Sequence, residues 1–302
     1  MITIRTYRDS DFKELAALLI RSHNMDSLTD ELIREKLYAD PDWNPESALV
    51  AEADESIAGF MMGVIRTIKG TVYGYVKLMT VDVRQRRKGL ATALYSKLEQ
   101  HFLENNVQFV RIYDVPLNYF VPGVDPGYTE AVCFALKRGF TRNGKAVNMT
   151  VNLNWSDWDS TEQETVLREK HIEFRRATPN DFKPLISFIS SEWALWGHEL
   201  GMGMKNEPVS IFLALRDNKI LAFAAYDCNN KGTGWFGPMG TDPLMRGHNL
   251  GRILLYKCLA ELRGQERKTA IIPWVAPIGF YAHHANARIS RTFWRFQKHI
   301  QD

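Results

Sequence analysis

The sequence is poor in cysteine, with three among its 302 residues: Cys133, Cys228 and Cys258. They are too few and too scattered for a disulfide framework or a zinc site, and neither a CxxC nor an HExxH motif occurs. We therefore expect reduced, buried thiols in a cytoplasmic protein, and no bound metal.

Long apolar runs are also missing. No stretch approaches the roughly eighteen uninterrupted apolar residues of a membrane span, and the first residues lack the apolar core of a signal peptide. The net charge of +3 is small, whereas a general nucleic-acid binder needs a large and clustered basic surplus. These absences predict a protein that has neither a membrane nor a nucleic acid as its partner.

What the chain does contain is a long-period repeat, which for 302 residues favours two domains. The pair Arg5 and Asp11 recurs 170 residues later as Arg175 and Asp181. A run over residues 86–98 recurs at an offset of 160, because the second copy is shorter through its middle. We place the N-terminal domain at residues 1–152, the linker at residues 153–170 and the C-terminal domain at residues 171–302. The segment assigned to the linker is rich in polar residues and has little apolar periodicity.

Both copies show the same order of expected elements. A short strand and an amphipathic helix precede two strands, and then a third strand, a basic turn, a long helix with an apolar stripe and a last strand follow. This order predicts a mixed α/β sheet in each domain. Expected strands cover residues 2–5, 48–52, 57–66 and 107–115 in the first copy, and residues 172–175, 211–216 and 220–227 in the second.

Three short patterns predict local structure. Residues 178–181 have the sequence of a capping box with proline at the first helical position. Pro238, inside a strand pattern, predicts a bulge. Asn143 and Gly144 are typical of a hairpin turn between two strands.

The most informative segment is residues 78–94, where a strand ends in a basic turn that enters a helix. The first turn of a helix has backbone N–H groups without intrahelical partners, and together with the helix dipole they form an anion site. Gly89 lets a phosphate approach the backbone closely, while Arg86 and Lys88 add positive charge. The turn therefore predicts a pyrophosphate site, and the alternative interpretation is an ordinary solvated turn.

The pattern Arg86-x-x-Gly89-x-Ala91 resembles the coenzyme A signature of the GNAT acetyltransferases, and the resemblance extends over both copies. It implies two tandem GNAT-like domains, each a mixed, mostly antiparallel sheet flanked by helices. It also implies that a backbone N–H near Thr80 or Val81 polarises the thioester carbonyl. The cofactor-binding residues that the resemblance implies in the first copy are Met79, Thr80, Val81, Val83, Arg86, Arg87, Lys88, Gly89, Leu90, Ala91 and Thr92.

The activity that the resemblance implies is acyl-CoA-dependent N-acyl transfer, with acetyl-CoA as the cofactor. The expected acceptor is a primary amine on a small molecule, a peptide or an amino sugar, and a homodimer is a further expectation. Two alternatives stay open. The first alternative is a sensor that binds acyl-CoA without catalysis. The second is a chain with an enzyme in one half and a structural or dimerisation module in the other.

The second copy keeps the turn but changes one residue. Asn249 stands where the first copy has Gly89, and asparagine tolerates left-handed backbone angles although its side chain crowds a phosphate. Coenzyme binding at this turn is therefore an open alternative to a degenerate site. The corresponding residues are Thr241, Arg246, Gly247, His248, Asn249 and Gly251.

The two copies also differ at the tyrosine that commonly protonates the departing thiolate in GNAT enzymes. Ala135 replaces it in the first copy, whereas the second has Tyr281, which is the candidate catalytic acid or a packed core residue. We favour the N-terminal domain as the main coenzyme site. The loop over residues 116–128 is expected to shape the acceptor site. The candidates for the general base are Glu52, Asp114, Asp227, His198 and His283.

Overall fold

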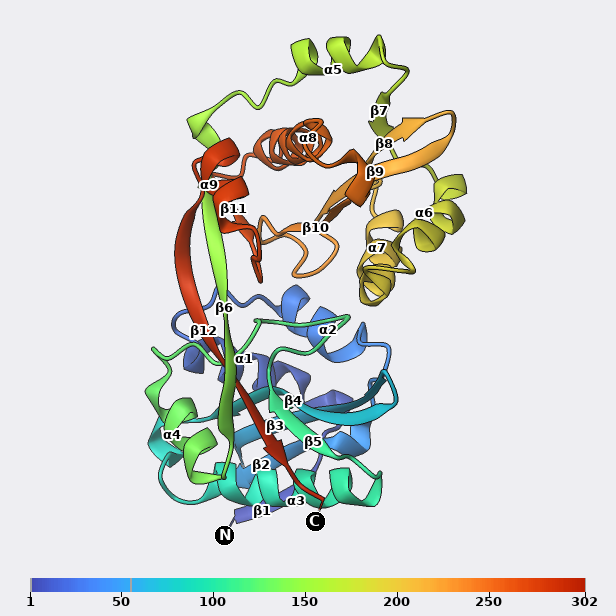
Figure 1. The fold of residues 1–302 in the computed structure, drawn as a ribbon. Coiled ribbons are helices and arrows are strands. Elements are labelled where there is room, and N and C mark those ends of the chain that lie inside the picture. The colour runs from blue at the N-terminus through green and yellow to red at the C-terminus, as the bar shows by residue number, and fades with distance from the viewer. Residues whose placement is uncertain (1, 55, 302) are drawn as a thin grey trace. The chain divides into compact units, whose positions relative to one another are not determined.

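The structure is a computed structural model that describes residues 2–54 and 56–301. The chain forms two compact units (Figure 1). The N-terminal unit contains Met1–Ala146 and Thr292–Asp302, and the C-terminal unit contains Val147–Arg291. Within the described part of the chain, no helix has the length and apolar character needed to cross a membrane.

The N-terminal unit is built on a mixed sheet in which β1 to β4 are successive antiparallel neighbours and β4 pairs with β5 in parallel. The strands predicted at residues 48–52 and 57–66 are confirmed. The last predicted strand, residues 107–115, is shorter in the structure because Tyr113 and Asp114 have left-handed backbone angles, with φ of 57° and 36°. The elements of this unit are β1 (Ile2–Thr6), α1 (Phe12–Ser22), α2 (Asp30–Tyr38), β2 (Ala48–Ala53), β3 (Ser56–Ile68), β4 (Thr71–Val81), α3 (Leu90–Glu104), β5 (Phe109–Ile112) and α4 (Thr129–Lys137).

The two repeats exchange their last strands. The hydrogen-bonded order continues from β5 to β12 (Arg288–His299) and then to β6 (Thr141–Asn152). Residues 296–299 of β12 pair with β5 in the N-terminal unit, while residues 149–152 of β6 pair with β11 (Thr269–Ile272) in the C-terminal unit. The boundaries between the compact units, after Ala146 and after Arg291, therefore differ from the boundary between the two sequence repeats.

The prediction of a hairpin turn at Asn143 and Gly144 was wrong, because both residues lie inside β6. The neighbours of β6 in the sheet are β11 and β12, and β12 comes from the far end of the chain. Polar contacts hold β12 in the N-terminal unit: the Nε of Arg295 lies 2.8 Å from Asp114 Oδ2, and Lys298 Nζ lies 2.6 Å from Glu99 Oε1.

The helix α3 packs closely against the sheet of the N-terminal unit. A Cβ added to Gly63 of β3 would lie 2.7 Å from the Phe102 ring, and one added to Gly74 of β4 would lie 2.9 Å from it. Glycine at these two positions therefore lets the aromatic ring sit directly on the strands. Leu94 and Leu98 of the same helix are fully buried, which confirms the predicted apolar stripe.

The C-terminal unit has a four-stranded antiparallel sheet in the order β10-β9-β8-β7. Side chains alternate between its two faces, so that Phe212 packs with α8 in one core cluster while Leu213 packs in the other with α6 and α7. A register shift between Phe236 and Met239 confirms the bulge predicted at Pro238. The elements are α5 (Thr161–Arg168), β7 (Glu173–Arg176), α6 (Phe182–Ile189), α7 (Gly197–Met204), β8 (Ile211–Arg216), β9 (Lys219–Tyr226), β10 (Phe236–Thr241), α8 (Leu250–Gly264) and α9 (Ile278–Ala285).

The repeated Arg and Asp residues make the same ion pair in both units. Arg5 Nη1 lies 2.6 Å from Asp11 Oδ2, and Arg175 Nη1 lies 2.7 Å from Asp181 Oδ2. Each pair ties the first strand of its repeat, β1 or β7, to the start of the following helix. The capping box predicted at residues 178–181 is also present.

The segment expected to be a linker packs in the C-terminal unit. Trp158 is 2% exposed and its Nε1 donates a hydrogen bond of 2.8 Å to the Leu153 carbonyl. Its ring meets Tyr256 of α8 edge to face, and α5 follows it. Residues 153–170 therefore contribute to the core of this unit.

We predict that Phe296→Ala destabilises the N-terminal unit by about 3–5 kcal/mol, because this ring is 1% exposed and its loss leaves a cavity under β12. Peptide-resolved hydrogen exchange over β3 to β5 measures the loss. The control is Ile289→Ala on the same strand, whose side chain is 51% exposed and whose loss should cost less than about 0.5 kcal/mol. Equal protection in the two variants would contradict the role assigned to β12.

Candidate functional site

The candidate site begins where β4 and β5 part. Their parallel pairing ends at Val76 and Ile112, whereas β4 continues to Val81. On its other edge, β4 stays paired with β3 as far as Val81. Beyond Val76, no other described strand pairs with the edge of β4 that faces away from β3, although the Met79 backbone contacts the Tyr113 hydroxyl. The backbone of Thr80 and Val81 is therefore the part of this edge that suits a ligand with amide groups.

A tight turn joins this strand end to α3. The Asp82 side chain accepts a hydrogen bond from the Arg84 backbone N–H, and contacts with Arg84 and Arg21 hold the pKa of Asp82 well below its usual range. Two residues of the turn are left-handed, Arg87 with φ of 63° and Gly89 with φ of 88°. Gly89 is the N-cap of α3, and apart from its own chain neighbours no described residue has an atom within 4 Å of the place where its Cβ would stand. The start of the helix is thus open to an anion.

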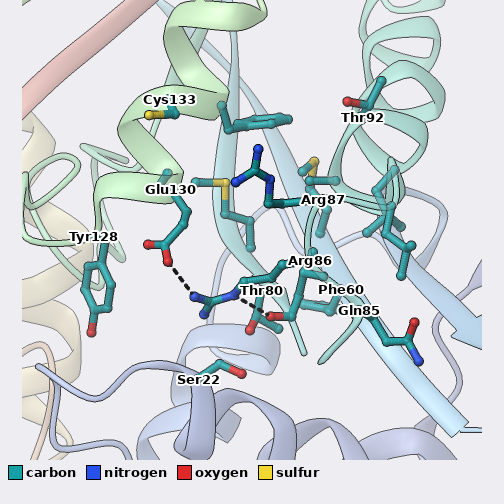
Figure 2. A pocket seen from close by; sticks show the side chains of 18 of the residues that line it. Ser22, Phe60, Thr80, Gln85, Arg86, Arg87, Thr92, Tyr128, Glu130 and Cys133 are labelled. Atoms are coloured by element: carbon teal, nitrogen blue, oxygen red, sulfur yellow. Dashed lines mark hydrogen bonds and ion pairs between the residues drawn. The ribbon is translucent and has the colours of Figure 1, made fainter. Parts of the chain in front are cut away.

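A cavity of about 750 Å³ lies between this turn, the end of β4 and α4. In Figure 2, Gln85 and Thr92 lie on one side of it, and Tyr128 lies on the opposite side. Of the cofactor-binding residues predicted in the first copy, two are not part of its wall: Val83 is 69% exposed, and Lys88 donates to Gln85 Oε1 at 2.8 Å. The predicted residues that line it are Met79, Thr80, Val81, Arg86, Arg87, Gly89, Leu90, Ala91 and Thr92.

Two polar groups of the cavity wall have a direct bearing on a ligand. Arg86 Nη1 lies 2.9 Å from Glu130 Oε1 of α4, so a carboxylate neutralises the arginine that the sequence assigns to a phosphate (Figure 2). The hydroxyl of Thr80 is buried and has no hydrogen-bond partner among the described residues. An anion-binding turn joined to a buried, unsatisfied hydroxyl fits a long ligand with a phosphate end and a polar reactive end.

The second copy reproduces the turn with glycine at the other position. Gly247 and Asn249 are its left-handed residues, with φ of 82° and 62°, and Asp242 caps the turn through the Leu244 N–H. Asn249 therefore does adopt the left-handed conformation expected of it. The backbone needs two left-handed residues in each copy, and each copy supplies one glycine.

Two large apolar side chains lie beside the second turn. A Cβ added to Gly251 would lie 3.2 Å from the Met239 methyl and 3.5 Å from the Phe280 ring. These side chains come from β10 and α9, the elements that match β4 and α4. Their counterparts in the N-terminal unit, Met79 and Phe134, line the cavity there.

The tyrosine predicted as an acid, Tyr281, lies in the core of the C-terminal unit and is 6% exposed. Its ring meets Phe236 and Phe280 edge to face, and burial raises the pKa of its phenol above the usual value. At the matching position of the N-terminal unit, Ala135 is fully buried, while its neighbours Cys133 and Phe134 line the cavity.

The structure places the five base candidates apart. Glu52 is bound by Arg5 at the sheet edge. Asp114 is buried against Arg295, and burial raises its pKa to about 7. Asp227 accepts a hydrogen bond from the Gly232 N–H, and His198 and His283 lie on α7 and α9.

The cavity wall also contains three residues that sequence reasoning missed as site residues, His23, Tyr113 and Tyr128. They come from the end of α1, the end of β5 and the start of α4. Tyr128 is the last residue of the loop over residues 116–128, which the sequence predicted to shape the acceptor site. That prediction was the one indication in the sequence that Tyr128 lies at the site. Nothing in the local sequence distinguishes His23 or Tyr113.

We predict that Asn249→Ala destabilises the C-terminal unit by about 1–2 kcal/mol, because alanine lacks the tolerance of asparagine for left-handed angles. Asn249→Gly is the control and should leave the stability within a few tenths of a kcal/mol of the wild type. Urea denaturation with hydrogen exchange over α8 measures both. A loss in the glycine variant as large as in the alanine variant would show that the asparagine side chain, not the backbone angle, matters.

The chain was also compared with known proteins. It matches the acetyltransferase (GNAT) family twice, over residues 17–119 and 155–285. No curated protein matches it. A structure of a fungal multi-domain beta-N-acetylglucosaminidase, described as having a GCN5-related glucosamine N-acetyltransferase region, superposes with a TM-score of 0.83 at 17% identity. That alignment covers 99% of this chain and 38% of the fungal chain, so this chain spans well under half of that protein.

Two further structures have the same fold. A tandem GNAT protein from the clavulanic acid biosynthesis pathway aligns with a TM-score of 0.70 and 13% identity over 100% of both chains. Saccharomyces cerevisiae N-myristoyltransferase with bound myristoyl-CoA aligns with a TM-score of 0.66 and 11% identity, over 100% of this chain and 79% of the yeast chain. With both of its halves matched, this chain belongs to the acetyltransferase (GNAT) family, as a protein with two tandem GNAT domains.

Proposed function

We propose that this protein transfers an acyl group, acetyl in the first instance, from coenzyme A to a primary amine, and that the N-terminal unit binds the coenzyme. One observation carries the proposal: the left-handed turn at the start of α3 lines a cavity together with the end of β4, which extends beyond its pairing with β5. The phosphate end of coenzyme A suits the turn at the start of α3, and its amide-containing arm suits the end of β4. Membership of the family supports the same activity.

Different residues around the cavity would bind different parts of the coenzyme. Backbone N–H groups at the start of α3 would hold the pyrophosphate, with Arg86 and Arg87 adding charge. The backbone of residues 79–81 would pair with the pantetheine arm. The bound coenzyme supplies an activated acyl group as a thioester. The N–H groups at the end of β4 would polarise the acyl carbonyl, as the sequence resemblance implies.

The N-terminal unit is the better coenzyme site of the two. Gly89 leaves the start of α3 open, whereas Asn249 puts a side chain at the same place. Loss of cofactor affinity is harder to compensate than loss of one acid, whose contribution is roughly 10²–10⁴-fold. Tyr281 stays the predicted acid if the second unit is active.

The acceptor is a primary amine on a small molecule, peptide or amino sugar, and the fungal relative acts on glucosamine according to its description. A panel of amines incubated with acetyl-CoA and analysed by mass spectrometry identifies the acceptor. Binding of acetyl-CoA with neither thiol release nor an acetylated product from any amine would favour the alternative, a sensor that binds acyl-CoA without catalysis. The cytoplasmic location and a homodimer stay predictions.

We predict that Gly89→Asp weakens coenzyme A binding roughly tenfold or more relative to Gly89→Asn, because the two side chains have the same shape and only aspartate repels the phosphates. Calorimetry on the full-length protein measures both affinities. Gly89→Asn reproduces the residue that the second unit has in this turn and should bind moderately more weakly than the wild type. Wild-type affinity in Gly89→Asp would overturn the assignment of this turn.

We predict that Glu130→Gln tightens coenzyme A binding roughly two- to fivefold. In the wild type, Arg86 must give up its ion pair with Glu130 before it can pair with a phosphate, and the variant removes this competition. The effect is small because the Glu130 side chain is 66% exposed. Glu104→Gln, at the far end of α3, is the control for a general change in net charge and should leave the affinity unaltered. Weaker binding in Glu130→Gln would mean that the ion pair organises the site rather than competes for it.

A further inference from the structure

We infer that His23, at the end of α1, is the general base that accepts the proton of the acceptor amine. The inference rests on the proposed function and adds to it the one catalytic role that the five sequence candidates left open. It starts from the position of the residue: His23 lines the same cavity as the turn at Gly89 and the buried Thr80 hydroxyl.

The end of α1 is fixed beside the end of β4. Arg21 Nη2 lies 2.9 Å from Asp82 Oδ2, and Asp82 directly follows β4. Thr80 pairs with Phe60 on β3, and the Phe60 ring packs against Tyr7. Ser22, the last residue of α1, also lines the cavity and is drawn with Thr80 and Arg86 in Figure 2. The histidine therefore belongs to the part of the cavity formed by α1 and the strand end where the thioester is expected.

A hydrogen bond fixes the tautomer of His23. Its Nδ1 lies 3.0 Å from the carbonyl oxygen of Leu19, the residue one helical turn earlier. A carbonyl oxygen only accepts hydrogen bonds, so Nδ1 carries the proton in the neutral imidazole and Nε2 carries the lone pair. The ring is 6% exposed and meets the rings of Phe120 and Tyr128 edge to face. The imidazole is thus oriented by contacts on both sides, as an efficient base requires.

Other titratable groups of the cavity suit the role less well. Glu130 is engaged with Arg86. Burial raises the pKa of Tyr113 well above its usual value, so that phenol keeps its proton. Tyr128, whose ring meets that of His23, donates a hydrogen bond of 2.7 Å to Asp26 Oδ2. Histidine is the side chain whose ordinary titration lies nearest to neutral pH.

The proton transfer balances as follows. Nε2 accepts the proton that the amine nitrogen loses as its bond to the acyl carbon forms. The bond between that carbon and sulfur breaks, and the sulfur keeps the electron pair. The imidazolium releases its proton to water and the sulfur takes one from water, so coenzyme A leaves as the free thiol and the acceptor as a neutral amide.

The test uses full-length His23→Asn, because an asparagine amide reproduces the Nδ1–H donor toward Leu19 but has no basic nitrogen. With the amine that the wild type acetylates fastest, kcat should fall roughly 10²–10⁴-fold. A base must be neutral to act, so the rise of kcat/KM with increasing pH should disappear. The affinity for coenzyme A, measured by calorimetry, should be unchanged. His171→Asn, at an exposed histidine of the C-terminal unit, is the matched control and should leave all three unaltered.

Two further measurements separate catalysis from structure. Free imidazole should partly restore the activity of His23→Ala and should not affect the wild type. Long-range ¹H–¹⁵N spectra of the wild type at pH 8, recorded without coenzyme A, should show that His23 Nδ1 is protonated and Nε2 is not. A His23→Asn enzyme with the wild-type kcat and pH profile, or an Nε2-protonated imidazole, would overturn the role of His23 alone. A wild type that acetylates no amine would overturn the proposed function and this inference together.

Discussion

In the N-terminal unit, β4 stops pairing with β5 at Val76 and Ile112 while its own backbone continues to Val81. Parallel neighbours separate here because Tyr113 and Asp114 turn the chain away with left-handed backbone angles. The same separation gives the cavity one wall from the strand end and another from α4. The anion-binding turn, the unsatisfied Thr80 hydroxyl and the end of α1 have a common site only because this edge of the sheet is open.

The strand exchange makes that opening possible without leaving β5 unsupported. β5 is four residues long, from Phe109 to Ile112, and has β4 on one side and residues 296–299 of β12 on the other. The ion pair between Arg295 and Asp114 holds β12 next to the point where β5 turns away. The geometry of the candidate coenzyme site in the first repeat therefore depends on side chains from the last residues of the chain.

The two anion-binding turns show how one backbone shape is encoded in two ways. Arg87 and Gly89 are left-handed in the first, and Gly247 and Asn249 are left-handed in the second. Left-handed angles cost little for glycine and are tolerated by asparagine. The shape of the turn is thus kept in both repeats, but the open helix start is kept in the first alone. The two units consequently differ in the side chain at the start of this helix, although both turns have the same left-handed positions.

The sequence by itself determined those features that depend on neighbours within a few residues or on the repeat. These include the strands at residues 48–52 and 57–66, the apolar stripe of α3, the capping box at residues 178–181 and the bulge at Pro238. They follow from local backbone preferences and from the alternation of apolar and polar side chains, which a sequence displays directly. The tandem fold followed from the repeat together with the Arg86-x-x-Gly89-x-Ala91 pattern.

Only the tertiary structure decided which strands exchange partners and which side chains meet in the cavity. Asn143 and Gly144 have a typical turn sequence, yet they lie in a strand because β12 supplies hydrogen bonds from about 150 residues away. His23 and Tyr113 have no local motif, and they enter the site because α1 and β5 end at the same opening of the sheet. Such placements are set by contacts between distant segments, whose free energies no short stretch of sequence contains.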